Sequence, residues 1–447
     1  MNFNGKKIFV LGMARSGFEV AKLLVKKGNV VLVNDASEAQ NEEHMKELNN
    51  LGVAISLGSH PDELFDSSYD YLIKNPGIKN DHKYVVKAKK LGIPVINEVE
   101  AAFHLLPNDV NIIGITGSNG KTTTTTLIYE MLKNINKKVH LTGNIGRPLS
   151  GFINDIKSGD VIVIEISVQQ LCNFKDFKCN TAVLLNLYGA HLDFVKDITE
   201  YRNIKLRIFA NQTSSDFAVL NYDDEHIRSL TENLMPIKEY FSANDKKECC
   251  IIDESIYYKN EFIIKLSDIL IKGNHNYENI MASIITAKKY GVSNEMICKV
   301  LTTFKGVEHR IEYVTTLNDI AFYNDSKSTN TVATITALKS FTSPVILILG
   351  GLERNHDFNE LIPFMKDVKE IICYGECKNR IADFCNKNNV KVNVLETLEE
   401  AVMLAYKNAS MYDTILLSPA SASWDQFKDF EERGNHFKEI IEKLKES

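Results

Sequence analysis

The chain has 447 residues, which is too many for one hydrophobic core and predicts about three domains. Apolar residues make up 44% and charged residues 25%, and the net charge is −6, an ordinary balance that argues against nucleic-acid or membrane partners. The eight cysteines form no C-x-x-C pair, and neither a signal peptide nor a long apolar run is present, so we expect free thiols and a cytoplasmic location.

The first block, residues 1–97, opens with an α/β pattern. Strands are expected at Lys7–Leu11 and Val30–Asn34, with a glycine turn and a helix between them. The turn is similar to the dinucleotide fingerprint G-x-G-x-x-G, but Ala14 replaces the middle glycine, which weakens the case for NAD. Asp35 ends the second strand, where a ribose hydroxyl is often bound. A nucleotide-like ligand and plain helix packing both remain open for this turn.

The second block, residues 98–306, contains the most informative segment, Gly114-Ile-Thr-Gly-Ser-Asn-Gly-Lys-Thr-Thr123. It is predicted to join a strand to a helix that begins near Lys121. Such a loop offers backbone N–H groups and a helix N-terminus to a polyphosphate, while Lys121 adds charge and Thr122 a hydroxyl for Mg²⁺. The usual spacing has a glycine where this chain has Ile115, so we interpret the loop as a variant nucleoside triphosphate site and not as an ordinary turn.

Three charged residues follow the loop along a pattern typical of parallel α/β units. Glu165 ends an apolar run, where a carboxylate near a phosphate loop is well placed to hold Mg²⁺, although a solvated strand end is the alternative. His191 also follows a strand end and could be structural or a ligand. Lys205, judged by its spacing alone, is typical of a solvated helix lysine. Residues 250–271 predict a patch of short antiparallel strands, and a helix is expected from about His275 to Tyr290.

The third block, residues 307–447, carries expected strands at Val345–Leu349, Glu370–Tyr374 and Thr414–Leu417. The polar segment Asn324–Asn330 precedes a helix, where Ser, Thr and Asn act as caps in any protein. Lys327 within it is a cation that could meet an anionic ligand. Small polar residues after the last strand repeat that arrangement.

Taken together, these segments resemble the Mur ligases, ATP-dependent enzymes that add amino acids to a cell-wall precursor. The resemblance runs from Gly12 to Gly434 in one order and includes the variant loop itself. Ser418–Phe430, followed by Glu-Arg-Gly434, is similar to the D-glutamate-adding members. The resemblance implies an α/β fold of three domains. These are a Rossmann-like UDP-binding domain, a central P-loop ATPase-type domain with a parallel sheet, and a C-terminal Rossmann-like domain that binds the amino acid.

The resemblance also implies roles for individual residues. On the ATP side it implies Gly117, Ser118, Asn119, Gly120, Lys121, Thr122, Thr123, Asn276, Asn279, Arg310 and Asp325. The UDP substrate would contact Ser16, Asp35, Asn75, Pro76, Gly77, Asn144, Ser167 and Gln170. The D-glutamate pocket would contain Lys327, Thr329, Arg354, Ser423 and Phe430. One departure is Val168, which removes a hydroxyl that the family commonly has.

The implied catalytic residues are Lys121, Glu165, His191 and Lys205, and the implied cofactors are ATP and two Mg²⁺ ions. Thr122 and Glu165 would hold the first ion, and Glu165, His191 and Lys205 as a carbamate would hold the second. A substrate carboxylate would take the γ-phosphoryl group and then react with the D-glutamate amine. The implied partners are small molecules, namely UDP-N-acetylmuramoyl-L-alanine, D-glutamate and ATP. The protein itself is expected to be a monomer.

Three other functions fit the sequence less well. A folate-polyglutamate ligase has a related central domain, but it would begin directly with the ATP domain. An NAD-dependent oxidoreductase is disfavoured by Ala14 and by the phosphate loop. A catalytically inactive UDP-sugar-binding regulator is disfavoured because the four implied catalytic residues are retained.

Overall fold

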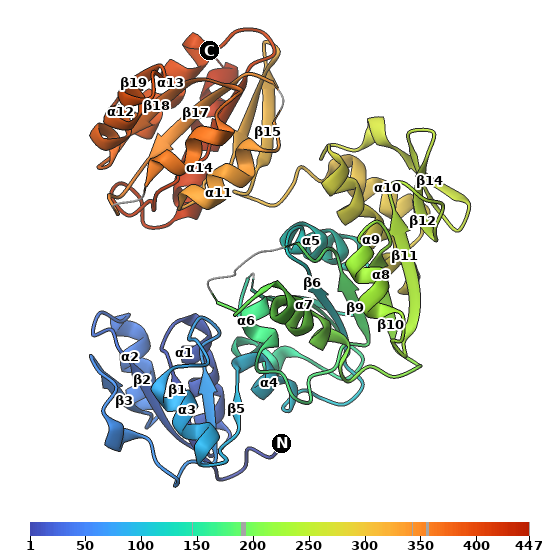
Figure 1. The fold of residues 1–447 in the computed structure, drawn as a ribbon, viewed down its shortest axis with the longest axis vertical. Helices are drawn as coiled ribbons and strands as arrows, with labels where there is room; N and C mark the ends of the chain where they lie inside the picture. Colours follow the sequence, from blue (N-terminus) through green and yellow to red (C-terminus); the bar gives the residue numbers. More distant parts are fainter. Residues whose placement is uncertain (145, 189–193, 342, 355–356, 447) are drawn as a thin grey trace. The chain divides into compact units, whose positions relative to one another are not determined.

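The computed structural model describes residues 1–144, 146–188, 194–341, 343–354 and 357–446 (Figure 1). Three sheets follow one another along the chain, which confirms the expected α/β fold of three domains. The chain divides into two compact units, Met1–Thr302, which holds the first two sheets, and Thr303–Ser447, which holds the third. Among the described helices, none combines the length and the apolarity that a membrane crossing needs.

The first sheet contains five parallel strands in the order β3-β2-β1-β4-β5, which is a Rossmann-type order. Its strands are β1 (Lys7–Leu11), β2 (Val30–Asp35), β3 (Ala54–Leu57), β4 (Tyr71–Lys74) and β5 (Val95–Ile96). The helices of this part are α1 (Arg15–Lys26), α2 (Glu42–Asn50) and α3 (Lys83–Lys90). Gly17 allows α1 to begin close to β1, because a Cβ there would lie 1.9 Å from the Gly12 carbonyl oxygen.

The second sheet contains nine strands in the order β14-β13-β12-β11-β10-β9-β6-β8-β7. The parallel strands are β6 (Asn111–Thr116), β7 (Val139–Gly143), β8 (Val161–Glu165), β9 (Thr181–Leu184), β10 (Phe217–Asn221), β11 (Ile237–Ser242) and β12 (Cys249–Ile252). Antiparallel pairing joins β12 to β13 (Ser255–Tyr258) and β13 to β14 (Glu261–Lys265), which confirms the predicted antiparallel patch.

The helices around the second sheet include two that reach the nucleotide loop. They are α5 (Lys121–Leu132) and α9 (Asn274–Lys289), which pack against each other. The others are α4 (Glu98–Phe103), α6 (Val168–Leu171), α7 (Ile198–Leu206), α8 (Glu225–Thr231) and α10 (Asn294–Thr303). Because the sheet is covered on both faces, every residue of β8 is buried, and its run Val-Ile-Val-Ile shows no polar alternation. The strand ends at Glu165, its single charged residue.

The third sheet contains six strands in the order β15-β16-β20-β17-β18-β19. They are β15 (Glu312–Leu317), β16 (Ile320–Asn324), β17 (Val345–Gly350), β18 (Val368–Tyr374), β19 (Val392–Val394) and β20 (Thr414–Leu417). An antiparallel hairpin joins β15 to β16, and the other pairs are parallel. The helices are α11 (Thr331–Leu338), α12 (Lys378–Lys387), α13 (Leu398–Asn408) and α14 (Phe430–Glu446). Because β16, β20 and β17 are parallel, their carboxyl ends lie together at one end of the sheet.

Glu98, at the start of α4, is a buried carboxyl that makes stability depend on pH. Its Oε1 accepts from the Ser150 N–H at 2.6 Å, and burial raises the pKa of Glu98 to about 7 from 4.5. Since the folded state binds this proton more tightly than the unfolded chain, the carboxyl costs nothing below the unfolded pKa and destabilises increasingly as the pH rises to the folded pKa.

A Glu98→Gln variant is therefore expected to be more stable than the parent above the folded pKa, by on the order of 2 kcal/mol, with the difference fading toward about pH 5. Urea unfolding midpoints measured across this range check the result. The exposed Glu63→Gln substitution serves as the control and should leave the pH profile unchanged. A constant difference between Glu98→Gln and the parent at all pH values would contradict the assignment.

Candidate active site

The glycine-rich loop lies between β6 and α5, at the carboxyl end of the central sheet. The chain turns at Gly120, whose φ is +80° and whose Cβ, if present, would lie 2.1 Å from Asn279 Oδ1. The loop is fixed from the neighbouring strand end, because the N–H groups of Ser118 and Asn119 donate to Asn186 at 3.1 and 2.8 Å. Its shape is therefore set before any ligand binds.

A Gly120→Ala variant is expected to fold but to bind ATP at least about tenfold more weakly, because both the backbone and the Asn279 amide must move. Gly159→Ala is the matched control: Gly159 has a φ of +87°, but no other atom lies within 4 Å of the added Cβ. Nucleotide titration of both variants separates the loss of loop shape from the general cost of a left-handed alanine. Equal ATP affinity in the two variants would contradict this account of the loop.

Two lysines converge on this loop from different elements. Lys121 Nζ donates to the carbonyl oxygens of Gly117 and Ser118, both at 2.8 Å. Lys205, on α7, donates to Thr116 Oγ1 at 3.0 Å and to the same Gly117 carbonyl at 2.8 Å. The ammonium groups are thus held at the place where an anionic polyphosphate is expected.

Lys205 is not the solvated helix lysine that its spacing suggested, since only 1% of it is exposed. The prediction from spacing was wrong because α7 packs over the end of β6, a contact that no local pattern encodes. Burial, together with the nearby Lys121 charge, holds the pKa of Lys205 well below its usual value. Burial therefore favours the neutral amine over the ammonium at this position.

Glu165 faces the same region from the end of β8 and is also 1% exposed. Its Oε1 accepts from Asn144 Nδ2 at 2.9 Å, and its Oε2 has no hydrogen-bond partner among the residues that the structure describes. A buried carboxylate oxygen is costly when it is left unpaired, and it is the ligand type that Mg²⁺ prefers. The residues present therefore fit a magnesium ion. Thr122, the other expected ligand, is buried at the first turn of α5, and His191 lies outside the described residues.

The expected adenine-side residues lie on α9, next to the loop. Asn279 is buried, and its Oδ1 accepts from Thr124 Oγ1 at 3.2 Å, which ties α9 to α5. Asn276, one turn earlier, is 3.5 Å from Asn279 Nδ2 through its Oδ1. The structure thus brings these two asparagines together beside Gly120.

The expected UDP-side residues of the first sheet gather where β1, β2 and β4 end. Asp35 Oδ2 accepts from the Met13 N–H at 2.7 Å, and Asn75 Nδ2 donates to Ser16 Oγ at 3.3 Å. Pro76 follows in the turn after β4, and the Gly77 N–H donates back to Asn75 Oδ1 at 3.1 Å. The structure therefore places these five sequence-predicted residues in one cluster.

Ser167 and Gln170 form a capping box at the start of α6. Gln170 Oε1 accepts from the Ser167 N–H at 2.9 Å, and Ser167 Oγ accepts from the Gln170 N–H at 3.3 Å. Ser167 lies two residues after Glu165, so this pair fixes the chain just beyond the carboxylate. The departure at Val168 is a buried apolar contact with Val195 and Tyr201.

In the second unit, the expected residues surround the ends of β16 and β20. Asp325 is buried, and its carboxylate accepts from Ser328 Oγ, Ser418 Oγ and the Ile311 N–H at 2.5, 2.7 and 3.2 Å. Burial raises the pKa of Asp325 to about 6. Arg310, the expected ATP-contacting arginine, is exposed one residue before Ile311.

The expected D-glutamate residues supply two cations beside aromatic rings in the same unit. Lys327 Nζ lies 5.6 Å from the centre of the Phe430 ring, and the Arg354 guanidinium lies 4.6 Å from the Trp424 ring. Thr329 is half-buried in the loop that follows Lys327, and Ser423 is buried. Positive charge and small polar groups are the chemistry that an amino-acid carboxylate requires.

Arg433 was not singled out from the sequence, yet it organises this region from α14. It is fully buried and donates to Ser326 Oγ, to the Ser326 carbonyl and to the Ser421 carbonyl at 3.0, 2.8 and 3.0 Å. A signal was present, because Arg433 shares its helix face with Phe437 and Ile441 at a spacing of four residues. A charge on an apolar helix face indicates a buried, bonded arginine.

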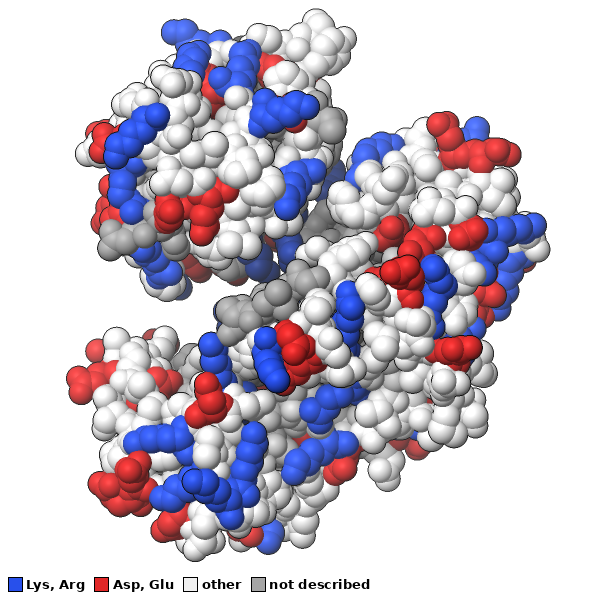
Figure 2. Space-filling view, viewed as in Figure 1, with Lys and Arg blue, Asp and Glu red and all other residues white. Residues whose placement is uncertain are grey.

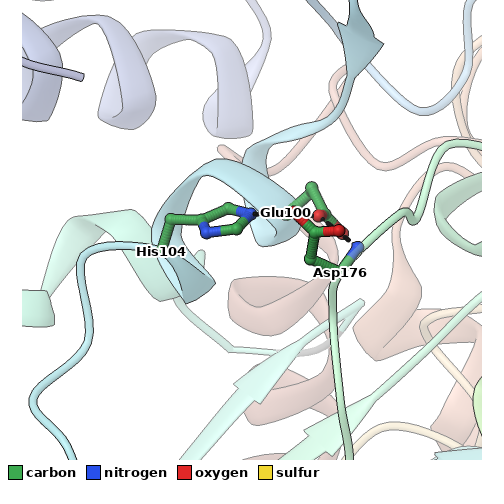
Figure 3. A group of neighbouring side chains, drawn as sticks. All are labelled: Glu100, His104 and Asp176. Atoms are coloured by element: carbon green, nitrogen blue, oxygen red, sulfur yellow. Dashed lines mark hydrogen bonds and ion pairs between the residues drawn. The ribbon is translucent and has the colours of Figure 1, made fainter. Parts of the chain in front are cut away.

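One group of metal-type ligands lies away from the loop, among Glu100, His104 and Asp176 (Figure 3). His104 Nε2 is 3.3 Å from Glu100 Oε1 and 3.2 Å from Asp176 Oδ2. The Glu100 carboxylate already accepts three backbone N–H groups, from Lys175, Asp176 and Phe177. These bonds join α4 to the segment 175–177.

On the face shown in Figure 2, basic and acidic side chains are interspersed.

Comparison with known proteins gives three family models that match successive parts of the chain. They are described as the Mur ligase MurD-like N-terminal domain, the Mur ligase middle domain and the Mur ligase glutamate ligase domain. They match residues 6–97, 115–287 and 309–421.

The chain is similar along its length to curated bacterial proteins. The UDP-N-acetylmuramoylalanine–D-glutamate ligase of Bacillus cereus (strain G9842) is 43% identical over 99% of this chain and 98% of that protein. The protein of the same name from Geobacillus sp. (strain WCH70) is 42% identical over 99% of each.

Solved structures share the fold at low identity. UDP-N-acetylmuramate-alanine ligase MurC from Thermotoga maritima is 20% identical, with a TM-score of 0.59 over 98% of this chain and 100% of that one. MurF from Acinetobacter baumannii is 15% identical, with a TM-score of 0.59 over 94% and 91%.

Proposed function

This chain belongs to the Mur ligase family, and on that premise we propose that it joins D-glutamate to UDP-N-acetylmuramoyl-L-alanine at the expense of ATP. It is an amide-forming ligase of peptidoglycan precursor synthesis, acting on small molecules in the cytoplasm as a monomer. The match of the N-terminal domain at residues 6–97 favours this activity over a folate-polyglutamate ligase. We assign the domains to residues 1–97, 98–306 and 307–447.

One observation at the site carries the proposal: a buried carboxylate oxygen without a partner among the described residues lies in the same domain as two lysines bonded to one phosphate-type loop. Glu165 supplies that oxygen, and Lys121 and Lys205 both donate to the Gly117 carbonyl. A hydrolase or ligase that neutralises a polyphosphate needs such a set, whereas a hydride-transfer enzyme does not.

Two magnesium ions are proposed for this site. Thr122 and Glu165 would hold the first, and Glu165, His191 and a carbamylated Lys205 would hold the second. When bound, Mg²⁺ supplies positive charge that offsets the negative charge of the phosphate oxygens. The support within the chain is the unpaired Glu165 Oε2, together with an amine that lies at the same loop.

The proposed carbamate follows from the chemistry of a buried amine. The neutral Lys205 nitrogen attacks the carbon of CO₂, a nitrogen–carbon bond forms, and the proton of the amine leaves. One carbon–oxygen π bond of CO₂ opens onto oxygen, so the neutral amine becomes an anionic carbamate with two oxygen ligands. The lowered pKa of Lys205 supports this step, because only the unprotonated amine has the lone pair that it needs.

The proposed reaction has two steps. The terminal carboxylate of the UDP substrate attacks the γ-phosphorus of ATP, so that ADP leaves and an acyl phosphate forms. The amine of D-glutamate then attacks the carbonyl carbon, phosphate leaves, and the amine loses a proton. Lys121 and the N–H groups of the loop hold the phosphates, because two anions must approach each other in the first step.

The UDP end of one substrate and the D-glutamate are assigned to different domains. Ser16, Asp35 and Asn75-Pro76-Gly77 would bind the UDP end, with Asn144, Ser167 and Gln170 nearer the reacting carboxylate. The D-glutamate pocket would consist of Lys327, Thr329, Arg354, Ser423 and Phe430. The support is the cluster at the ends of β1, β2 and β4 and the two cations of the C-terminal domain.

Phosphate release from ATP in the presence of UDP-N-acetylmuramoyl-L-alanine and single amino acids tests the proposal. Turnover is expected with D-glutamate and not with L-glutamate. Release that needs no amino acid, or that occurs only with L-lysine or L-alanine, would overturn it. Sedimentation at assay concentration tests the monomer.

A further inference from the structure

A cavity of about 830 Å³ lies at the amino ends of the parallel strands of the central sheet. Its walls include the start of β6 at Asn111, the start of β9 at Thr181, and the chain just beyond the ends of α5 and α9. The phosphate loop lies at the other ends of β6, α5 and α9. The cavity is therefore separate from the proposed ATP site, and the proposed reaction does not use it.

Three lysines and one aspartate line this cavity, namely Lys137, Lys178, Lys289 and Asp216. The aspartate is already neutralised, since Lys178 Nζ lies 2.8 Å from its Oδ2. The same oxygen also accepts from the N–H and the hydroxyl of Thr213, at 2.6 and 2.8 Å. Asp216 therefore adds little repulsion toward an incoming anion.

The other two lysines leave the cavity with uncompensated positive charge. Lys137 and Lys289 are exposed, and neither forms an ion pair with a carboxylate of the described residues. Lys289 Nζ lies 4.8 Å from the centre of the ring of Phe217, the first residue of β10. The lining also offers amide donors, because Asn180 uses its Oδ1 to accept from the Ile112 N–H at 2.8 Å and keeps its Nδ2 for another partner.

A purely structural account covers only part of this arrangement. Lysines near helix C-termini interact favourably with the helix dipole, and Lys289 lies in the last turn of α9. That account does not explain the volume of the cavity. It also does not apply to Lys178, which precedes β9 and pairs with Asp216 instead.

We propose that this cavity binds a small polyanion, a metabolite that carries at least two phosphate or carboxylate charges. Lys137 and Lys289 supply its main electrostatic attraction, and the amides of Asn136 and Asn180 supply hydrogen-bond donors. The cavity is large enough for a compact metabolite, since ligand pockets commonly span a few hundred to about 1,000 Å³.

Calorimetric titration with two probes tests the site, with pyrophosphate representing phosphate ligands and citrate representing carboxylate ligands. Because pyrophosphate could also bind the phosphate loop, the titrations use the full-length Lys121→Ala protein without Mg²⁺. Adding Lys137→Ala and Lys289→Ala to this protein is expected to weaken binding of the better probe at least about tenfold. The probe that binds more tightly identifies the ligand chemistry.

The matched control adds Lys246→Ala and Lys265→Ala, two exposed lysines of the same domain that lie outside the cavity, so the net charge changes equally. This control is expected to retain the affinity. Failure of both probes to bind saturably, or equal weakening by the two lysine pairs, would overturn the proposal. So would a cavity variant that lowers the unfolding midpoint but keeps the full affinity, because the lysines would then serve only the helix ends. None of these results bears on the ligase reaction.

Discussion

Replacing Lys205 with alanine is expected to lower ligase turnover at least about 10³-fold, because the second proposed Mg²⁺ loses an oxygen ligand. The substitution also removes contacts that Lys205 makes with the phosphate loop. Lys205 is buried against the loop, and its Nζ bonds to Thr116 Oγ1 and to the Gly117 carbonyl. Phosphate release with all three substrates measures the loss, and circular dichroism with ATP titration shows whether the fold and the loop persist.

Acetate separates the carbamate from a structural ammonium at Lys205. A small carboxylate can occupy the space that alanine leaves and can supply the missing oxygen ligand, so added acetate is expected to restore part of the turnover. A Lys205→Arg variant keeps the positive charge but cannot form the carbamate, and it is expected to stay inactive.

Lys74 is the control for this rescue, since it is also fully buried and its Nζ donates to the Ile78 carbonyl at 2.6 Å. Acetate should not change the activity of Lys74→Ala. An active Lys205→Arg enzyme would show that the residue acts as a cation and that the carbamate assignment is wrong.

Replacing Glu165 with glutamine is expected to lower turnover about 10²- to 10³-fold and to raise the Mg²⁺ concentration that half-maximal activity requires. The substitution keeps the side-chain shape, and the amide oxygen can still accept from Asn144 Nδ2. It removes the negative charge and the oxygen that lacks a partner. Because that oxygen makes no hydrogen bond with the described residues, the substitution should change the free energy of unfolding only slightly while it lowers turnover strongly. Initial rates measured over a range of Mg²⁺ concentrations check both parts.

Glu239→Gln is the matched control for Glu165→Gln. Glu239 is a buried glutamate of the same domain, but its carboxylate is bonded to Lys259 Nζ and Tyr258 OH, at 2.5 and 3.0 Å. Its substitution is expected to lower stability and to leave the Mg²⁺ dependence unchanged. A Glu165→Gln enzyme with the parent's rate and Mg²⁺ requirement would remove Glu165 from the metal site.

Local pattern was enough to predict many of the strands and the glycine turns. The strands predicted at Lys7–Leu11 and Thr414–Leu417 are observed with those bounds, because short apolar runs between turn residues have few alternatives. The hairpin of β15 and β16 was not predicted. All but one residue of β15 are half-buried, which gives a weak hydrophobic signal, and the pairing of β15 with β16 is irregular between Tyr313 and Thr315.

Side chains that matter through long-range contacts were harder to foresee. The spacing around Lys205 gave no sign of burial, since the residues that cover it come from about 90 positions earlier in the chain. The resemblance to the family assigned it a role, but the burial and the lowered pKa are seen only in the fold. Arg433 was overlooked for a related reason, because its partners lie in loops that the helix pattern does not reveal.

The sequence by itself determined the fold class, the phosphate loop and the family, because each depends on residues that are neighbours along the chain. A glycine at position 120 followed by Lys121 and Thr122 predicts a turn and a helix start from adjacent residues alone. The tertiary structure alone decided that Glu165 keeps a buried oxygen without a partner in the described part of the chain and that Lys205 reaches the loop. The reason is physical: burial changes the cost of a charge, and burial is a property of the packed elements rather than of any one segment.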